Sequence, residues 1–378
     1  TSLMTPPVSE PEFAISDGAH TSGNAHFYFL PPMVPAPSFA GAFDPTQTPV
    51  VQICELAGAV CRLPLIAQFT MAGGAGSETV RLDAAVEQYI VNWHTDRFAL
   101  DVTRTYRIRV QAHDLDLGFA DVDLVTSSRD LLNVDPQRFI GVVNGWTLPI
   151  KFRIEVGAVS CAPQVSVDAN NLVLGLQAGR LPSLNRGIGG GFFQGTQVLF
   201  AGGIAYGTSG TDVVVGYDTR GILQHLDLTS PVCSVRRGPD QETFATGQPL
   251  PEIAGPPGLV VTQRSLAFGT PPDDDYVLFV YTITNTGPTS LANLFAGLIM
   301  DWDVFFSGNF SNDVAAFNVA LQVAEVTELA SPQVVGVAPI LSAPLNYAGY
   351  YPFGPPPNDP TTPAGYFGLL SGGIQPAI

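Results

Sequence analysis

The sequence contains very little lysine and little charge of either sign. Among its 16 basic residues only Lys151 is a lysine, and charged residues make up 13% of the chain, about half of the usual share. Uncharged polar side chains and apolar atoms must therefore cover much of the surface. Such a surface suits an extracellular protein that packs against neighbours or a glycan matrix, although GC-rich codon usage also depletes lysine.

The sequence has no basic run and no long apolar stretch, which disfavours nucleic acid and a membrane span. The net charge of −17 and the lack of any basic run argue against binding to nucleic acid. No apolar stretch reaches the length that spans a membrane. Thr1 does not open a signal peptide, but a signal removed before Thr1 would leave the same sequence, so export stays open.

Long helical patterns are missing as well. Gly (39) and Pro (33) form roughly a fifth of the 378 residues, which is typical of short strands joined by turns. The sequence therefore predicts an all-β protein of two β-sandwich domains, Ig-like or jelly-roll-like, at 25–157 and 165–378. An extended N-terminal arm is expected at 1–24 and a linker at 158–164. The Pro- and Gly-rich segment 238–258 is predicted to be a surface loop.

Three segments of the first domain alternate between apolar and polar residues, namely Glu87–Thr95, Thr105–Ala112 and Thr147–Gly157. This period of two indicates antiparallel strands with one buried face. The inward set is Tyr89, Val91, Trp93, Tyr106, Ile108, Val110, Leu148, Ile150, Phe152, Ile154 and Val156. The outward set is Arg107, Arg109, Lys151, Arg153 and Glu155.

The four cysteines fit two disulfides in an oxidising compartment. Cys54 and Cys61 flank a short loop, which favours a local bridge, and Cys161 and Cys233 would then form the second pair. Four free buried thiols are the alternative. Zinc is disfavoured because neither a Cys-x-x-Cys motif nor a histidine at ligand spacing is present. We expect an extracellular or cell-surface protein.

The stretch Tyr276–Phe317 is the most site-like part of the sequence. It predicts a strand, a turn at Asn285–Pro288 and a second strand that ends in Asp301-Trp302-Asp303. Between Val277 and Ile283 both alternating sets are apolar or aromatic, which predicts a strand covered on both faces.

Carboxylate and amide side chains gather at the end of this second strand and after it. They are Asp301, Asp303, Asn309, Asn312 and Asp313. Ca²⁺ takes about six to eight oxygen ligands, which such a loop can supply, although the spacing is not that of an EF-hand. The alternative is that these side chains cap turns and accept hydrogen bonds from backbone N–H groups. A glycosidase pair is disfavoured because two carboxylates on one strand rarely flank a sugar.

No catalytic residue is predicted. Ser209 lies in a Gly-Thr-Ser sequence, but the partner motifs of a catalytic triad are missing. His20, His26 and His94 are scattered along the chain, so solvated or packing roles are expected for them rather than a metal site.

Two further motifs have ordinary explanations. An acidic hairpin contains Asp114, Asp116, Asp121 and Asp123. A solvated face is expected there, and a second cation site is the minor alternative. Asn309 opens an N-x-S glycosylation sequon, which by itself is a weak signal.

The first domain resembles a known module over about residues 24–157. The resemblance rests on Tyr89–Thr95, Tyr106–Val110, Leu117–Asp123 and Thr147–Glu155. This module is repeated in large secreted bacterial proteins, where it lies beside Ig-like domains. The resemblance implies export and a β-rich fold, and it implies no chemistry.

The second domain resembles the β-sandwich found downstream of subtilisin-like peptidase domains in secreted bacterial proteins. The resemblance covers about 165–370 and rests on Val261–Ser265, Tyr281–Thr286, and Gly297 followed by Asp301-Trp302-Asp303. It brings no catalytic residues. That module continues with further strands after the part matching Gly365–Gly373, whereas this sequence stops at Ile378, so the last strands are absent, supplied elsewhere or outside this sequence.

These observations predict a non-enzymatic extracellular assembly protein. A sandwich that lacks strands exposes a sheet edge, and the N-terminal arm of a neighbouring copy, including Glu12, Phe13, Ala14 and Ile15, is expected to cover it by strand addition. Head-to-tail contacts of this kind give a filament when the rotation does not close. The alternative is a substrate- or glycan-binding accessory module of a secreted hydrolase. Its sugar-stacking aromatics would be Trp146, Tyr347, Tyr350, Tyr351 and Phe353.

Overall fold

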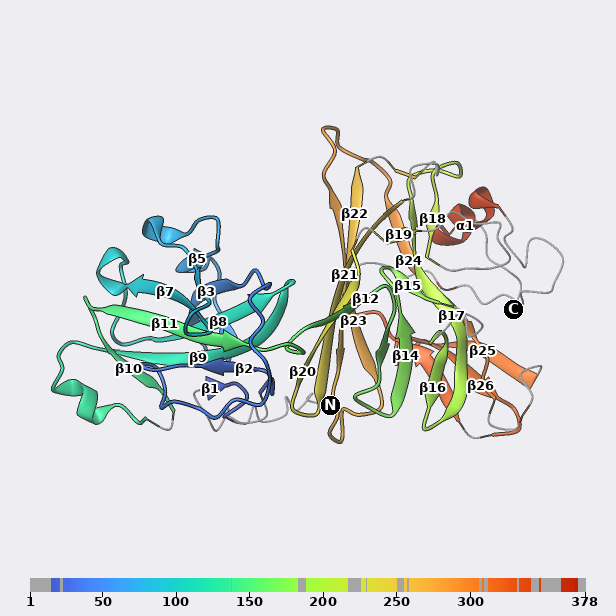
Figure 1. Cartoon of the computed structure of the whole chain (residues 1–378). Helices are drawn as coiled ribbons and strands as arrows, with labels where there is room; N and C mark the ends of the chain where they lie inside the picture. Colours follow the sequence, from blue (N-terminus) through green and yellow to red (C-terminus); the bar gives the residue numbers. More distant parts are fainter. Residues whose placement is uncertain are drawn as a thin grey trace. The chain divides into compact units, whose positions relative to one another are not determined.

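The chain folds into two compact, all-β units (Figure 1). The computed structural model describes residues 15–20, 23–136, 138–182, 188–216, 226–228, 230–249, 255–256, 258–305, 308, 312–331, 333–340, 347 and 362–372. The first unit is Thr1–Ser160 with Ser234–Pro239, and the second is Cys161–Cys233 with Asp240–Ile378. The boundary at Ser160 falls inside the predicted linker, but part of that linker is strand β12 (Ser160–Ala162).

The first unit contains two sheets that face each other. One has the order β1-β9-β8-β3-β4, with β10 parallel to β9 and β5 beside β3, and the other has the order β2-β11-β7-β6. The strands of the larger sheet are β1 (Ile15–Ser16), β3 (Val50–Ala57), β4 (Val60–Cys61), β5 (Ala67–Phe69), β8 (Thr105–Ala112), β9 (Leu115–Val125) and β10 (Ile140–Val143). Those of the smaller sheet are β2 (Phe27–Phe29), β6 (Arg81–Asp83), β7 (Gln88–His94) and β11 (Thr147–Ile154). Short 3-10 turns lie at Ala75–Ser77, Thr95–Arg97 and Asp130–Asn133.

The predicted alternation is confirmed where the two sheets cover each other. The inward residues of β7 and β8 are buried, and Trp93 of β7 meets the Tyr106 ring of β8 edge-on, with ring centroids 6.3 Å apart. Phe27 of β2 lies against Gly118 of β9, where a Cβ atom would come within 2.7 Å of the Phe27 ring. The apolar faces of the two sheets therefore form the core of this unit.

The prediction is wrong at the end of β11. Arg153 and Glu155 are buried, with Arg153 only 4% exposed, whereas Val156 is 63% exposed. The cause is the Pro-rich segment before β3, which lies over this face: Phe43 forms a bridge with Glu155, and Asp44 donates its N–H to Ile154. A polar residue on the outer face of a strand is thus buried by a covering segment.

Part of the predicted N-terminal arm is a strand of the first unit. Ile15 and Ser16 form β1 and pair with Ala120 and Phe119 of the same chain. Asp17 is buried and accepts hydrogen bonds from the backbone N–H groups of Ala19, His20 and Phe29. The other predicted arm residues, Glu12, Phe13 and Ala14, lie outside the described residues.

The second unit contains most of a six-stranded sheet, a seven-stranded sheet and a three-stranded sheet. The six-stranded sheet has the order β12-β20-β21-β22-β23, with β19 beside β21. The seven-stranded sheet has the order β13-β14-β16-β17-β15, with β18 and β24 beside β17, and β25-β26-β27 form the third. The six-stranded sheet uses β19 (Leu226–Leu228), β20 (Val232–Arg237), β21 (Asp240–Pro249), β22 (Leu259–Ala267) and β23 (Val277–Asn285). The seven-stranded sheet uses β13 (Val165–Val167), β14 (Leu172–Leu176), β15 (Arg180–Leu181), β16 (Gly191–Phe193), β17 (Thr196–Gly207), β18 (Val214–Val215) and β24 (Phe295–Trp302). The third sheet uses β25 (Asp313–Asn318), β26 (Val323–Glu328) and β27 (Val334–Val337).

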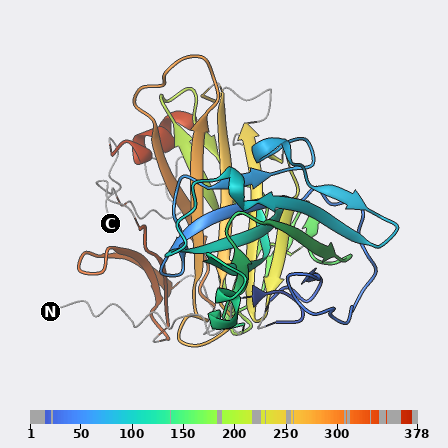
Figure 2. The same ribbon diagram turned by 90° about the vertical axis from the view of Figure 1, so that its left-hand side faces the viewer.

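The core of the second unit lies between the two larger sheets. Leu176 and Leu199 of one sheet share a buried cluster with Val232 and Ala245 of the other. Helix α1 (Pro363–Leu370) covers a further cluster on the seven-stranded sheet through the buried Tyr366. The long strands coloured yellow to orange run side by side in both views (Figures 1 and 2).

Two predictions fail in the second unit. The segment 238–258, predicted as a loop, contains the ten-residue strand β21, which lies between β20 and β22. The two strands predicted on either side of the turn at Asn285–Pro288 are present as β23 and β24, and they belong to different sheets: β23 pairs with β22, and β24 pairs with β17. In addition, β23 is half exposed instead of covered on both faces.

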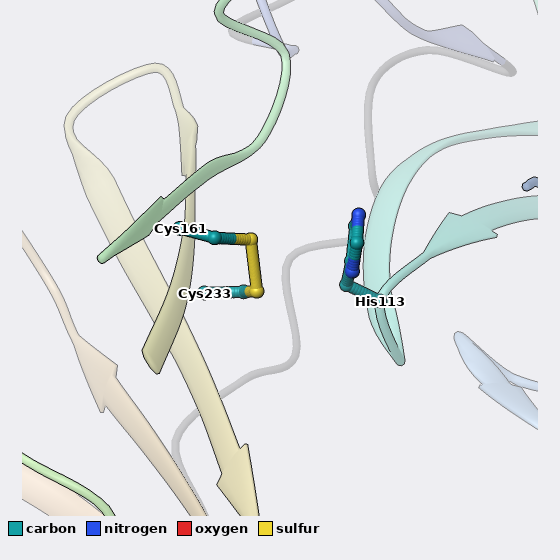
Figure 3. A group of neighbouring side chains, drawn as sticks. All are labelled: His113, Cys161 and Cys233. Atoms are coloured by element: carbon teal, nitrogen blue, oxygen red, sulfur yellow. A yellow bond between two sulfur atoms is a disulfide. The ribbon is translucent and has the colours of Figure 1, made fainter. Parts of the chain in front are cut away.

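The cysteines form the two disulfides that the spacing favours. Cys54 is joined to Cys61 in the first unit, and Cys161 to Cys233 in the second (Figure 3). Both sulfur atoms labelled in that view belong to one disulfide, so neither is available as a thiolate. His113, also labelled there, belongs to the first unit. Within the described residues, no helix has the length and apolar character needed to cross a bilayer.

Candidate functional site

The first candidate site is the open side of the second unit, which we define as the free edges of β23 and β24. Among the described residues, β23 has only β22 as a neighbour, and β24 has only β17. Both edges belong to the same side of the sandwich, because β17, which pairs with β24, packs through Ile204 and Tyr206 against Tyr281 and Ile283 of β23. Two neighbouring edges, one from each sheet, are therefore unpaired in the part of the chain that the structure describes.

Apolar side chains are exposed at this open side. Leu298 of β24 pairs with Ile204, so both point from the same face toward the sandwich interior. Ile204 is buried in a cluster with Tyr281 and Ile283 of β23, yet Leu298 is 41% exposed. An added strand would cover this apolar surface, and its backbone would satisfy edge N–H and C=O groups.

A buried hydroxyl lies beside the open side. Tyr206 of β17 pairs with Ala296 of β24 and belongs to the same interior cluster as Ile204. Its side chain is buried, and its hydroxyl has no hydrogen-bond partner among the described residues. Burial raises the pKa of Tyr206, so it stays a neutral donor. An unpaired buried hydroxyl is costly, and a group supplied from outside would relieve that cost.

The second candidate site is the acidic corner, formed by Asp301, Asp303, Asn312 and Asp313. Asp301 belongs to β24, Asp303 follows it, and Asp313 opens β25. The pKa of Asp303 is raised to about 6, first by burial and then by the charges of Asp301 and Asp313. Gln197 donates a hydrogen bond of 3.3 Å to Asp303. The structure thus places the three predicted carboxylates of Asp301, Asp303 and Asp313 close enough for their charges to affect one another.

The acidic corner is only partly satisfied by hydrogen bonds. One carboxylate oxygen of Asp313 accepts from the Val304 N–H at 2.9 Å, as the turn-capping alternative predicts. Its other oxygen, and the side-chain oxygen of Asn312, are buried without a partner in the described part of the chain. Burial is also the largest cause of the raised pKa of Asp313. Among the described residues, however, no three acidic side chains bring oxygens to one point, so calcium stays a prediction. Asn309 lies outside the described residues.

The raised pKa of Asp303 predicts a pH dependence of stability. The folded state holds this proton more tightly than the unfolded chain, so the stabilisation is complete below about pH 4 and is lost as the pH rises through about 6. We expect Asp303→Asn to unfold at a higher temperature than the parent at pH 7 and at nearly the same temperature at pH 4. Asp275→Asn, at an exposed position of the same unit, is the control. A variant less stable than the parent at pH 7 contradicts this prediction.

The remaining predicted residues do not form one site. His20 contacts Asp17 at 2.8 Å, His26 contacts Glu155 at 3.4 Å, and His94 lies 2.8 Å from Glu78. Each of these histidines therefore has its own carboxylate partner. Ser209 lies in a turn whose backbone N–H groups donate to Asp212, and its hydroxyl lies 3.0 Å from that of Thr211. This is a capped turn.

The acidic hairpin is paired with arginines, instead of forming a simply solvated face. Asp121 binds Arg107 through two hydrogen bonds of 2.6 and 2.9 Å, and Asp116 binds Arg109 at 2.6 Å. Burial raises the pKa of Asp123. The arginines neutralise two of the four carboxylates that the cation alternative needs.

The predicted aromatic platform is divided between the units. Trp146 is exposed in the first unit, and Tyr347, in the second, stacks on Phe317 with ring centroids 5.2 Å apart. The other aromatics, Tyr350, Tyr351 and Phe353, lie outside the described residues, as does the sequon at Asn309.

Comparison with protein-family models, with curated proteins and with solved structures finds no match. The sequence predicted an exposed sheet edge in the second unit, but it did not show that β23 and β24 form it, because Tyr206, Val280 and Leu298 read as ordinary strand residues. The strand Val277–Asn285 lacks the charge or proline that edge strands normally carry, so its sequence predicts a covered strand and gives no sign of an edge. The partners of β23 and β24 are fixed only by the tertiary fold.

Proposed function

We propose that the chain is a non-enzymatic extracellular assembly protein whose second unit accepts a β-strand at its open side. The observation that carries this proposal is the pair of edges, β23 and β24, unpaired among the described residues, with Leu298 exposed between them. Strand addition supplies affinity through backbone hydrogen bonds and specificity through alternate side chains. The two disulfides suit an extracellular location.

The filament form of this proposal requires a donor strand from a neighbouring copy. Because Ile15 pairs with Ala120 of its own chain, the donor predicted at Glu12–Ile15 is reduced to residues before β1. A filament subunit would therefore keep β1 in place and extend the chain before it toward the neighbour.

Light scattering across a range of protein concentrations, with negative-stain electron microscopy of the same samples, tests this function. We expect a mass that rises with concentration and, for the filament form, regular polymers. Deletion of residues 1–14, which leaves β1 intact, should abolish polymers if that segment is the donor. A monomer at every concentration would overturn the assembly proposal.

The exposed Trp146 favours glycan binding as the second candidate function. Its side chain is 58% exposed, which is unusual for tryptophan and suits stacking on a sugar ring. Pull-down on insoluble polysaccharide, without self-association, would support this accessory-module alternative, and Trp146→Ala should then lose the binding.

A further inference from the structure

We propose that β23 pairs with β23 of a second copy in antiparallel orientation, so that the two six-stranded sheets become continuous. This rests on the proposed assembly function and, at the edge of β23, names β23 of a second copy as the partner strand in place of the segment before β1. Of the two free edges, β23 is the better self-pairing strand: its nine residues carry no charge and no proline, whereas β24 contains Asp301. Uncharged strands rich in β-branched and aromatic residues are the edges most prone to pairing.

The sequence of β23 is self-complementary about Tyr281. In an antiparallel pair centred there, Phe279 lies opposite Ile283 of the second copy, and Val280 lies opposite Thr282. The first pair extends the inward face, because Phe279 and Ile283 both pack toward the core of their own unit. The second pair lies on the outer face, where Val280 is 46% exposed. Aromatic and β-branched cross-strand pairs are stabilising.

Charge selects the antiparallel orientation. The acidic residues Asp273, Asp274 and Asp275 lie just before β23, and two copies of a chain of net charge −17 repel each other. A parallel pair would place the two acidic triplets side by side. In the antiparallel pair centred on Tyr281 the nearest of them, the two copies of Asp275, are twelve strand positions or roughly 40 Å apart, which exceeds a Debye length of about 8 Å. The contact itself then brings no charge opposite another.

A charge exchange at the outer pair tests both the partner and the register. In Val280→Lys/Thr282→Lys, each lysine lies opposite a lysine of the second copy, and we expect the dissociation constant to rise about tenfold or more. In Val280→Lys/Thr282→Glu, each lysine lies opposite a glutamate, and self-association should be restored. Both variants carry the same lysine at position 280, which pairs with Arg264 of β22, so that contact within the monomer is matched.

A cross-linking measurement keeps the test independent of those variants. An equal mixture of Val280→Cys and Thr282→Cys copies should form an intermolecular disulfide faster than either variant alone. The β23 pairing is overturned if Val280→Lys/Thr282→Lys self-associates as the parent does and the mixed cysteine variants form no faster cross-link. The assembly function would still stand in that case. A parent protein that stays monomeric overturns both.

Discussion

Replacing Arg153 with methionine is expected to destabilise the first unit by about 3–5 kcal/mol, because it leaves a buried carboxylate without its cation. Arg153 donates to Glu155 at 3.2 Å and to Glu87 at 2.5 Å. Its guanidinium also lies 4.5 Å from the centre of the Phe39 ring and 5.4 Å from that of Phe43. After the substitution Glu155 remains fully buried, with the His26 ring 3.4 Å away.

Denaturant unfolding of two further variants separates the buried charge from lost packing. Arg109→Met removes a half-exposed pair with Asp116 and should cost about 1 kcal/mol or less. The double variant Arg153→Met/Glu155→Leu should recover most of the loss, since it removes the unpaired charge as well. A loss below about 1 kcal/mol for Arg153→Met, or no recovery in the double variant, would show that this network does not hold the covering segment.

Removing the Cys161–Cys233 disulfide is the second substitution with a large expected effect. Its cysteines are 72 positions apart, whereas Cys54 and Cys61 are 7 positions apart. In the chain-entropy account the longer loop contributes about 4 kcal/mol and the shorter about 2.5 kcal/mol. We therefore expect Cys161→Ala/Cys233→Ala to lose more stability than Cys54→Ala/Cys61→Ala.

Hydrogen exchange shows which part of the chain each disulfide variant destabilises and which variant is destabilised more. The longer bridge joins β12 to β20, so its removal should speed exchange in the six-stranded sheet of the second unit. The shorter bridge closes the β3–β4 turn, so its removal should speed exchange only in the first unit. Equal losses, or faster exchange in both units for either variant, would contradict this assignment.

Sequence alternation predicted the fold where a strand has one face on the core. Tyr89, Val91 and Trp93 are buried as expected because the opposite sheet covers them. The same rule failed at Arg153, since a segment distant in sequence covers the outer face. It also failed for β23, where two apolar faces indicate an edge that lacks a partner among the described residues rather than a strand covered on both sides.

The candidate sites were predictable to different extents. Asp301, Asp303 and Asp313 follow one another closely in sequence, so their clustering was foreseen, although their oxygens do not meet at one point in the described part of the chain. An exposed sheet edge was predicted for the second unit, but its position could not be read from the sequence. That position depends on β24 pairing with β17, and no local pattern encodes that choice.

The pairing of β17 with β24 also sets the order in which the second unit can fold. These strands are roughly a hundred positions apart in sequence, and contacts of such separation form slowly because a long loop must close first. Neighbours such as β21, β22 and β23 need only short connections and can associate early. As the chain emerges, β21, β22 and β23 can pair with one another while β17 still lacks β24. An uncharged β23 is then available to other chains before the core beneath it has closed.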